Sequence, residues 1–263
     1  MVRKTYGLVT TFLKNFNFAC DLQALSININ CLPGKRFLWL ACRHHIMELV
    51  VAIAFKTAFK EKSVNADIQL FVKFRKVWHD IDKTKYESCL NDDKVLNYIL
   101  SIKDELTTYV KDQLTNFPQI RDDYKELLVT LLVLGEKAPD YKIGAVKTYF
   151  IHTCGALHRA RWMARIIYSH KICLYRSQFA LTAEELTGLQ NFIVFVFVVY
   201  IKNWYEAPCA LKAAKNDLQL LKDIGRFKKI NISISGSVMS TFSRHLWHLS
   251  EMTSKRPERC FNT

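Results

Sequence analysis

The chain has 263 residues, of which 50% are hydrophobic, so it can bury a large core and is not a disordered chain. Glycine and proline are scarce, with 8 and 5 copies, and this scarcity, together with long apolar-periodic stretches, favours a mostly α-helical protein over a β-sandwich or barrel. The net charge of +14 favours a polyanionic partner, with nucleic acid ahead of an acidic membrane surface.

A strand followed by a helix is predicted where the regular patterning of the chain begins. Residues 37–41 are apolar throughout, as in an inner strand. From His44 the apolar residues fall at helical intervals, which predicts a helix that runs to about Lys60. We therefore expect a small β element that leads into a helical body.

The rest of the chain is predicted to be a succession of helices. Asn91 is a candidate N-cap, and Thr182-Ala-Glu-Glu185 has the capping-box pattern, in which a hydroxyl and a carboxylate satisfy each other's backbone donors. The longest apolar run, residues 192–201, is too short to cross a bilayer, so it predicts a buried helix and no membrane partner. The expected helices cover residues 68–78, 91–117, 121–134, 155–177, 183–200, 210–224 and 237–252, with a polar connection at 225–236.

Eight cysteines are spread over the chain without a secretory leader before them. Scattered cysteines in a large chain of this kind are typical of reduced thiols. The sequence therefore predicts a nuclear or cytoplasmic protein without structural disulfides.

The positive charge is concentrated between Tyr141 and Ala183, where no Asp or Glu occurs. Such a run is either a solvated basic face or a nucleic-acid contact. His158, Arg161 and Arg165 have helical spacing and would share one face, which favours phosphate contact. The full set of candidate DNA-binding residues is Lys142, Lys147, His158, Arg159, Arg161, Trp162, Arg165, Lys171 and Arg176.

Cys42 and His45 form a C-x-x-H pair in the densest cluster of chemically reactive side chains. A second cluster, residues 152–158, could complete a zinc site with it, but neither cluster has the paired spacing of an established zinc module. The alternative is that Cys42 is a small buried residue and His45 a hydrogen-bonded core histidine. No phosphate-binding glycine loop, nucleophile elbow or H-E-x-x-H motif is present.

Three motifs follow one another along the chain: Cys42-x-x-His45 follows the predicted strand, Arg161-Trp162 follows a long helical stretch, and Glu251 lies on a late predicted helix. Their order resembles that in the hAT superfamily of DNA transposases. In that family a helical domain is inserted into a ribonuclease-H-like fold after a C-x-x-H motif, an R-W pair lies in the insertion, and the last catalytic glutamate is on the helix that follows.

A second likeness covers most of the chain from about residue 37. Residues 40–45, 160–164 and 244–249 resemble phrases in a set of uncharacterised, transposon-derived invertebrate proteins. The two likenesses together imply a mostly α fold with a small β element, in which a helical insertion domain is attached to an incomplete ribonuclease-H-like α/β core. The implied parts are a core remnant at 1–41, a helical domain at 42–236, and a C-terminal helix and tail at 237–263.

The resemblance also implies a catalytic site of three carboxylates that hold divalent ions such as Mg²⁺. Asp21 and Glu251 are the two candidates, and Glu251 has an alternative interpretation as an exposed residue at a helix end. Asp21 alone precedes Cys42, so we expect metal-dependent cleavage to fail and no cofactor to be needed. Trp162 likewise has two interpretations, a DNA contact or a large core anchor.

Three functional hypotheses follow. The first is an inactive, truncated transposase derivative that binds DNA non-specifically and with steep salt dependence through its basic helical surface. The second is an active metal-dependent transposase or nuclease whose missing carboxylate comes from Asp21 or from another chain. The third is a helical module that binds an acidic protein; self-association is left open in each case.

Overall fold

The structure is a computed structural model, and it describes residues 43–60, 68–83, 85–116, 126–128, 164–207 and 212–245. Every regular element among these residues is helical, which confirms the prediction of a mostly α protein. No strand of a ribonuclease-H-like core occurs in these ranges. The predicted strand at 37–41 lies outside the described residues.

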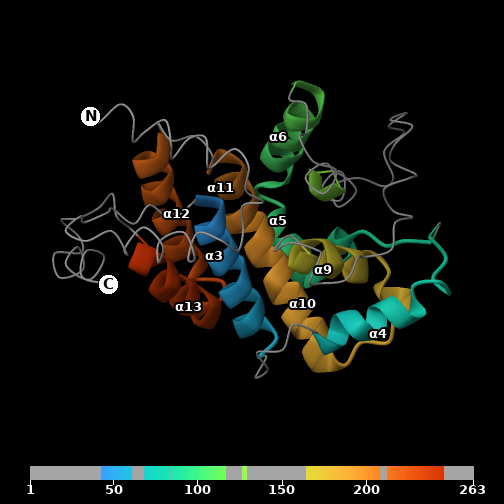
Figure 1. Ribbon diagram of the computed structural model, residues 1–263. Helices are drawn as coiled ribbons and strands as arrows, with labels where there is room; N and C mark the ends of the chain where they lie inside the picture. The colour runs from blue at the N-terminus through green and yellow to red at the C-terminus, as the bar shows by residue number, and fades with distance from the viewer. Residues whose placement is uncertain are drawn as a thin grey trace, which may run out of the picture.

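The helices follow one another closely along the described ranges (Figure 1). In chain order they are α3 (Arg43–Ala58), α4 (Gln69–Val77), η1 (Cys89–Asn91), α5 (Asp93–Ile99), α6 (Lys103–Asn116), α9 (Ala164–Leu174), η2 (Arg176–Gln178), α10 (Ala183–Phe195), η3 (Val196–Tyr200), α11 (Ile201–Glu206), α12 (Ala213–Phe227), α13 (Ile232–Phe242) and η5 (Ser243–His245).

A single continuous helix, Ala183–Glu206, lies at the centre of the protein and consists of α10, the π-helical segment η3 and α11. The capping box predicted at its start is confirmed: the backbone N–H of Glu185 donates to Thr182 Oγ1 at 3.1 Å, and the backbone N–H of Thr182 donates to the Glu185 carboxylate at 2.9 Å. By length and composition alone this helix could cross a membrane, but 61% of its apolar window is buried inside the protein. It is therefore the core helix that the apolar run predicted.

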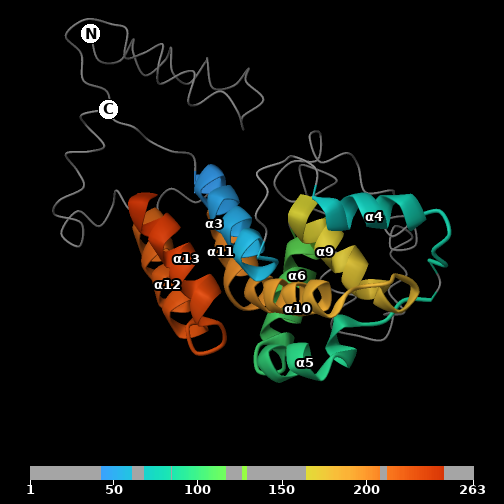
Figure 2. The ribbon, with the colours of Figure 1, turned by 90° about the horizontal axis from the view of Figure 1, so that it is seen from below.

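Two groups of helices cover this central helix (Figures 1 and 2). On one side α3 packs along α13, and α12 lies beside α13 as the first arm of a helical hairpin. Around α10, α9 and α4 lie on one side of the helix and α5 lies on the opposite side in Figure 2. Gly188 permits the close approach of α10 to the end of α3, because a Cβ atom at this position would lie 2.8 Å from Phe59 Cδ1 and 3.0 Å from the Ala58 carbonyl oxygen.

Several predicted helix boundaries need correction. The cap of α5 is Asp92, whose carboxylate accepts from the backbone N–H groups of Lys94 and Val95, so Asn91 is not the cap. The helix predicted at 91–117 is two helices, α5 and α6, separated by a tight turn at residues 100–102. The polar connection predicted at 225–236 is helical at both ends, and the boundary predicted between residues 236 and 237 falls inside α13.

The start of α3 is joined to α12 by an ion pair and to the central helix by an aromatic contact. Arg43 forms an ion pair with Asp217, whose side chain is 2% exposed. His44 stacks on Trp204 with ring centroids 4.8 Å apart. Two residues of the cluster that sequence reasoning considered for metal binding thus hold helices together.

The Arg43–Asp217 pair gives a stability prediction. Arg43→Met would remove a cation that is paired with a buried carboxylate, so we expect the free energy of unfolding to fall by about 3 kcal/mol. The double variant Arg43→Met/Asp217→Leu removes both charges and should recover most of that loss. Urea unfolding of the two single variants and the double variant measures this coupling; strictly additive losses would contradict it.

His170 is a fully buried histidine on α9. Its Nδ1–H donates to the Ile166 carbonyl oxygen at 2.8 Å, and its ring meets Phe197 edge-on at 5.4 Å. Burial lowers the pKa of His170 from 6.5 to about 4, against the opposing effect of the Ile166 hydrogen bond. The folded protein therefore keeps this ring neutral, while the unfolded chain takes up a proton near pH 6.5.

This difference predicts acid destabilisation. Because the unfolded state binds the proton first, stability should fall as the pH drops from 6.5 towards 4, by about 3 kcal/mol in all. His170→Gln does not titrate and should lack this part of the loss. Unfolding curves at several pH values would show the two proteins diverging below pH 6.5; curves that stay parallel would show that His170 is not responsible.

Candidate nucleic-acid interface

Most of the residues that the sequence singled out lie outside the described residues. These are Asp21, Cys42, Lys142, Lys147, His158, Arg159, Arg161, Trp162 and Glu251. His45 lies in α3, and only its backbone is described. The roles predicted for these residues and for His45 stay predictions. Arg165, Lys171 and Arg176 are described, on α9 and η2, and Arg165 is partly buried there.

Lys171 is not placed to contact a phosphate. Its side chain is 1% exposed, and its Nζ lies 2.5 Å from the Glu126 carboxylate and 5.5 Å from the centroid of the Trp78 ring. A buried ammonium with a carboxylate and an aromatic face beside it is part of the core. The prediction that Lys171 binds DNA is therefore corrected.

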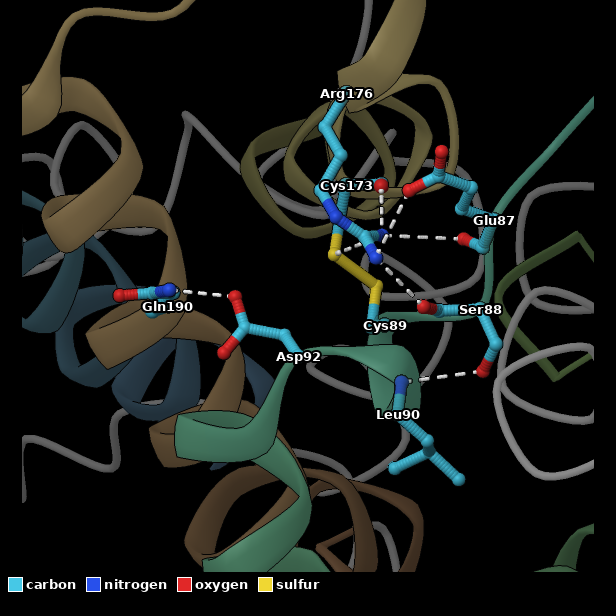
Figure 3. Close-up of polar contacts among 8 residues, drawn as sticks. All are labelled: Glu87, Ser88, Cys89, Leu90, Asp92, Cys173, Arg176 and Gln190. Carbon is cyan, nitrogen blue, oxygen red and sulfur yellow. Dashed lines mark hydrogen bonds and ion pairs between the residues drawn. A yellow bond between two sulfur atoms is a disulfide. The ribbon is translucent and has the colours of Figure 1, made fainter.

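Arg176 is likewise engaged within the protein (Figure 3). Its guanidinium donates to the carbonyl oxygens of Glu87, Ser88 and Cys173 at 3.3, 3.1 and 2.8 Å, and it lies 3.2 Å from the Glu87 carboxylate. The side chain is 14% exposed. Arg176 thus fastens residues 87–88 to the end of α9, and it too leaves the set of candidate DNA contacts.

A disulfide joins Cys89 to Cys173 beneath Arg176 (Figure 3). Both side chains are buried. The prediction that all eight cysteines are reduced thiols does not hold for this pair. Long-range pairing of this kind has no signal in the spacing of the two cysteines, which are 84 residues apart.

A shallow depression of about 540 Å³ lies beside Arg176 and is also lined by Asp92 and Leu186. Its charged groups are already engaged, because Asp92 caps α5 and accepts from Gln190 Nε2 at 2.5 Å. The described residues contain no group of three or more His, Cys, Asp or Glu side chains that could hold a metal ion.

A dense group of exposed basic residues lies on α12 and directly beside its two ends. Lys215, Lys222 and Arg226 have helical i, i+7, i+11 spacing, share one face and are all exposed. Lys212 precedes the helix, and Lys228 and Lys229 lie in the turn after it, again exposed. We call these six residues the α12 basic face.

The opposite side of α12 is buried and holds the helix in place. Its buried residues are Ala213, Asn216, Asp217, Leu220, Ile224 and Phe227. The only acidic residues of α12 are Asp217, which is paired with Arg43, and Asp223, which accepts from Asn203, Gln219 and Arg226. Among the described residues, none of the five lysines of the basic face has a carboxylate partner. The face therefore presents uncompensated charge to solvent.

A second large described stretch differs in charge from the region of α12. Residues 68–116 contain eight basic and eight acidic residues, so positive charge there is balanced. Residues 212–229 contain six basic and two acidic residues, and both of the acidic side chains are largely buried. The charge asymmetry thus places the candidate nucleic-acid interface on α12.

Sequence reasoning missed this surface. The segment 210–224 was predicted only to be helical, and the DNA-binding surface was predicted in the run without acidic residues at 142–182. The signal that could have found the α12 basic face is the amphipathic pattern of residues 212–229, in which the basic positions alternate with the apolar ones at helical spacing. Asp217 and Asp223 lower the net charge of this segment, so a simple count of charges does not single out the α12 basic face.

Comparisons with known proteins add no family to this geometry: no family model, curated protein or solved structure matches the chain.

Proposed function

We propose that this protein binds nucleic acid through the α12 basic face. The observation that carries the proposal is the row of six exposed cations along and just beyond a single well-anchored helix, without carboxylate partners for its lysines among the described residues. Such a row suits phosphates, because each cation that neutralises a phosphate releases condensed counterions from the nucleic acid. Contacts of this kind give affinity without sequence preference.

The support beneath the face strengthens the proposal. α12 is fixed by the Arg43–Asp217 ion pair and by hydrogen bonds from Asn203 Nδ2 to Asp223 at 3.1 Å and from Asn216 Nδ2 to the Glu206 carbonyl oxygen at 2.9 Å. Cations on a rigid helix lose little conformational freedom when they meet phosphates, and this lowers the free-energy cost of binding.

The resemblance to hAT transposases extends the proposal to origin and chemistry. In this proposal the helical body corresponds to the insertion domain of such a transposase, and the protein is a nuclear or cytoplasmic DNA-binding derivative that does not cut DNA. The support is the order of Cys42-x-x-His45, Arg161-Trp162 and the late helix along the chain. Basic residues of the segment 142–165 would add to the binding surface.

The competing enzyme hypothesis makes a separate claim. An active transposase would need Asp21 and Glu251 as metal ligands, so Asp21→Asn and Glu251→Gln would each abolish Mg²⁺-dependent cleavage while leaving binding intact. Both residues lie outside the described residues, and no observation on the described surface favours this hypothesis.

DNA binding over a salt series tests the proposed function. We expect the full chain to bind a fluorescent duplex at low salt and to lose affinity steeply as salt rises. Lys215→Glu/Lys222→Glu/Lys229→Glu should weaken binding at least about ten-fold and lower the slope of log affinity against log salt by about three, because three phosphate contacts are lost.

The matched control carries the same change in net charge elsewhere. Lys56, Lys76 and Lys94 are exposed and lie on α3, α4 and α5, so their triple replacement by Glu alters the total charge equally. This control should retain most of the affinity. Equal losses in the two triple variants would mean that net charge alone drives binding, and absence of binding at low salt would leave an acidic protein as the partner to be sought.

A further inference from the structure

The disulfide between Cys89 and Cys173 closes a long loop of the chain (Figure 3). Cys89 is the first residue of η1, and Cys173 lies in the last turn of α9. Their Cα atoms are 5.9 Å apart, within the usual range for a disulfide. The enclosed loop contains α5, α6 and the basic segment 142–165, so the bond restrains a third of the chain.

The two cysteines are held side by side by contacts that do not involve the bond itself. The Glu87 N–H donates to the Leu174 carbonyl oxygen at 2.8 Å, and Arg176 binds the carbonyl oxygens of Glu87, Ser88 and Cys173. The Gln178 side chain makes two further hydrogen bonds to Asp82. Its Nε2 donates to the Asp82 carbonyl oxygen at 3.0 Å, and its Oε1 accepts from the Asp82 N–H at 2.8 Å. These contacts would keep two reduced thiols adjacent, so the bond can break and form again without refolding.

Arg176 also places a positive charge next to one of the sulfurs. Its Nη1 atom lies 3.9 Å from Cys173 Sγ. A cation in this position favours the thiolate, which is the form that attacks disulfides. Of the two cysteines, Cys173 is therefore the attacking one, and Arg176 is its positioning residue.

We propose that Cys89 and Cys173 form a reversible thiol–disulfide switch that exchanges with a small-molecule disulfide such as oxidised glutathione. The Cys173 thiolate attacks this disulfide, which gives a mixed disulfide and releases one glutathione thiolate. Cys89 then loses its proton, and its thiolate attacks Cys173 Sγ and displaces the second glutathione. Two electrons pass from the protein to the small-molecule disulfide, and two glutathione thiols reverse the sequence.

Access to the buried sulfurs requires local opening of residues 85–92. This segment has little regular structure before η1, and its contacts with α9 and η2 include the backbone hydrogen bond from Glu87 to Leu174 and the side-chain hydrogen bonds of Arg176 and Gln178. Opening of such a segment needs less free energy than global unfolding. The switch therefore operates on the folded protein, and it is independent of whether the α12 basic face binds nucleic acid.

Redox titration of the purified full chain tests the switch. The protein is equilibrated in glutathione buffers of graded composition, free thiols are alkylated, and the oxidised fraction of the Cys89 and Cys173 peptides is measured by mass spectrometry. The pair should pass from about nine-tenths reduced to about nine-tenths oxidised over a roughly hundred-fold change in the ratio of squared thiol to disulfide concentration. Titrations in both directions should coincide, with the helical circular dichroism unchanged.

Two variants sharpen the test. Cys89→Ser should trap the mixed disulfide of Cys173 with glutathione, whereas Cys173→Ser should trap much less at Cys89, because the contact of Arg176 is with Cys173 Sγ. Arg176→Gln should slow oxidation of the pair at least about ten-fold. A pair that stays wholly reduced or wholly oxidised across the series in the folded chain, or equal trapping in the two serine variants, would overturn the proposal.

Discussion

Burial of the central helix Ala183–Glu206 is the constraint on which the other helices depend. Large apolar side chains, among them Phe192, Phe195, Tyr200 and Trp204, are fully buried on different sides of this helix. A helix that is apolar around most of its circumference must be covered on all sides. Helix α3 and the α12–α13 hairpin cover one side, and α9 and α5 cover two further sides of α10, with α4 next to α9 (Figure 2). The charged face of α12 points outward because its apolar face is used in this covering.

The same packing decides which cations meet solvent. Lys171 and Arg176 face the interior of the protein. Glu126 and Trp78 lie beside Lys171, and backbone carbonyl groups surround Arg176. The lysines of α12 lie on the outside of the hairpin, opposite the buried residues that hold it. A basic residue is therefore a candidate for phosphate binding only after its element has been placed in the fold.

Local signals in the sequence predicted helices well, and signals that depend on tertiary packing were missed. The helix from His44 and the capping box at Thr182 were predicted because apolar spacing and capping chemistry act within a few residues. Gly225 and Gly236 suggested a connection, yet both lie inside helices with open space around them, where a glycine costs only about 1 kcal/mol relative to alanine. The Cys89–Cys173 pair and the burial of Lys171 arise from contacts between distant segments, and no local pattern announces them.

Lysine footprinting tests the central claim most directly, because it maps the contact surface within a single protein. The full chain is acetylated briefly with and without a DNA duplex, and the modification of each lysine is measured by mass spectrometry. The account predicts that Lys212, Lys215, Lys222, Lys228 and Lys229 become protected, while the exposed Lys56, Lys76 and Lys94 react as before. Protection of the second group, or unchanged reactivity of the first in a sample that binds the duplex, would contradict it.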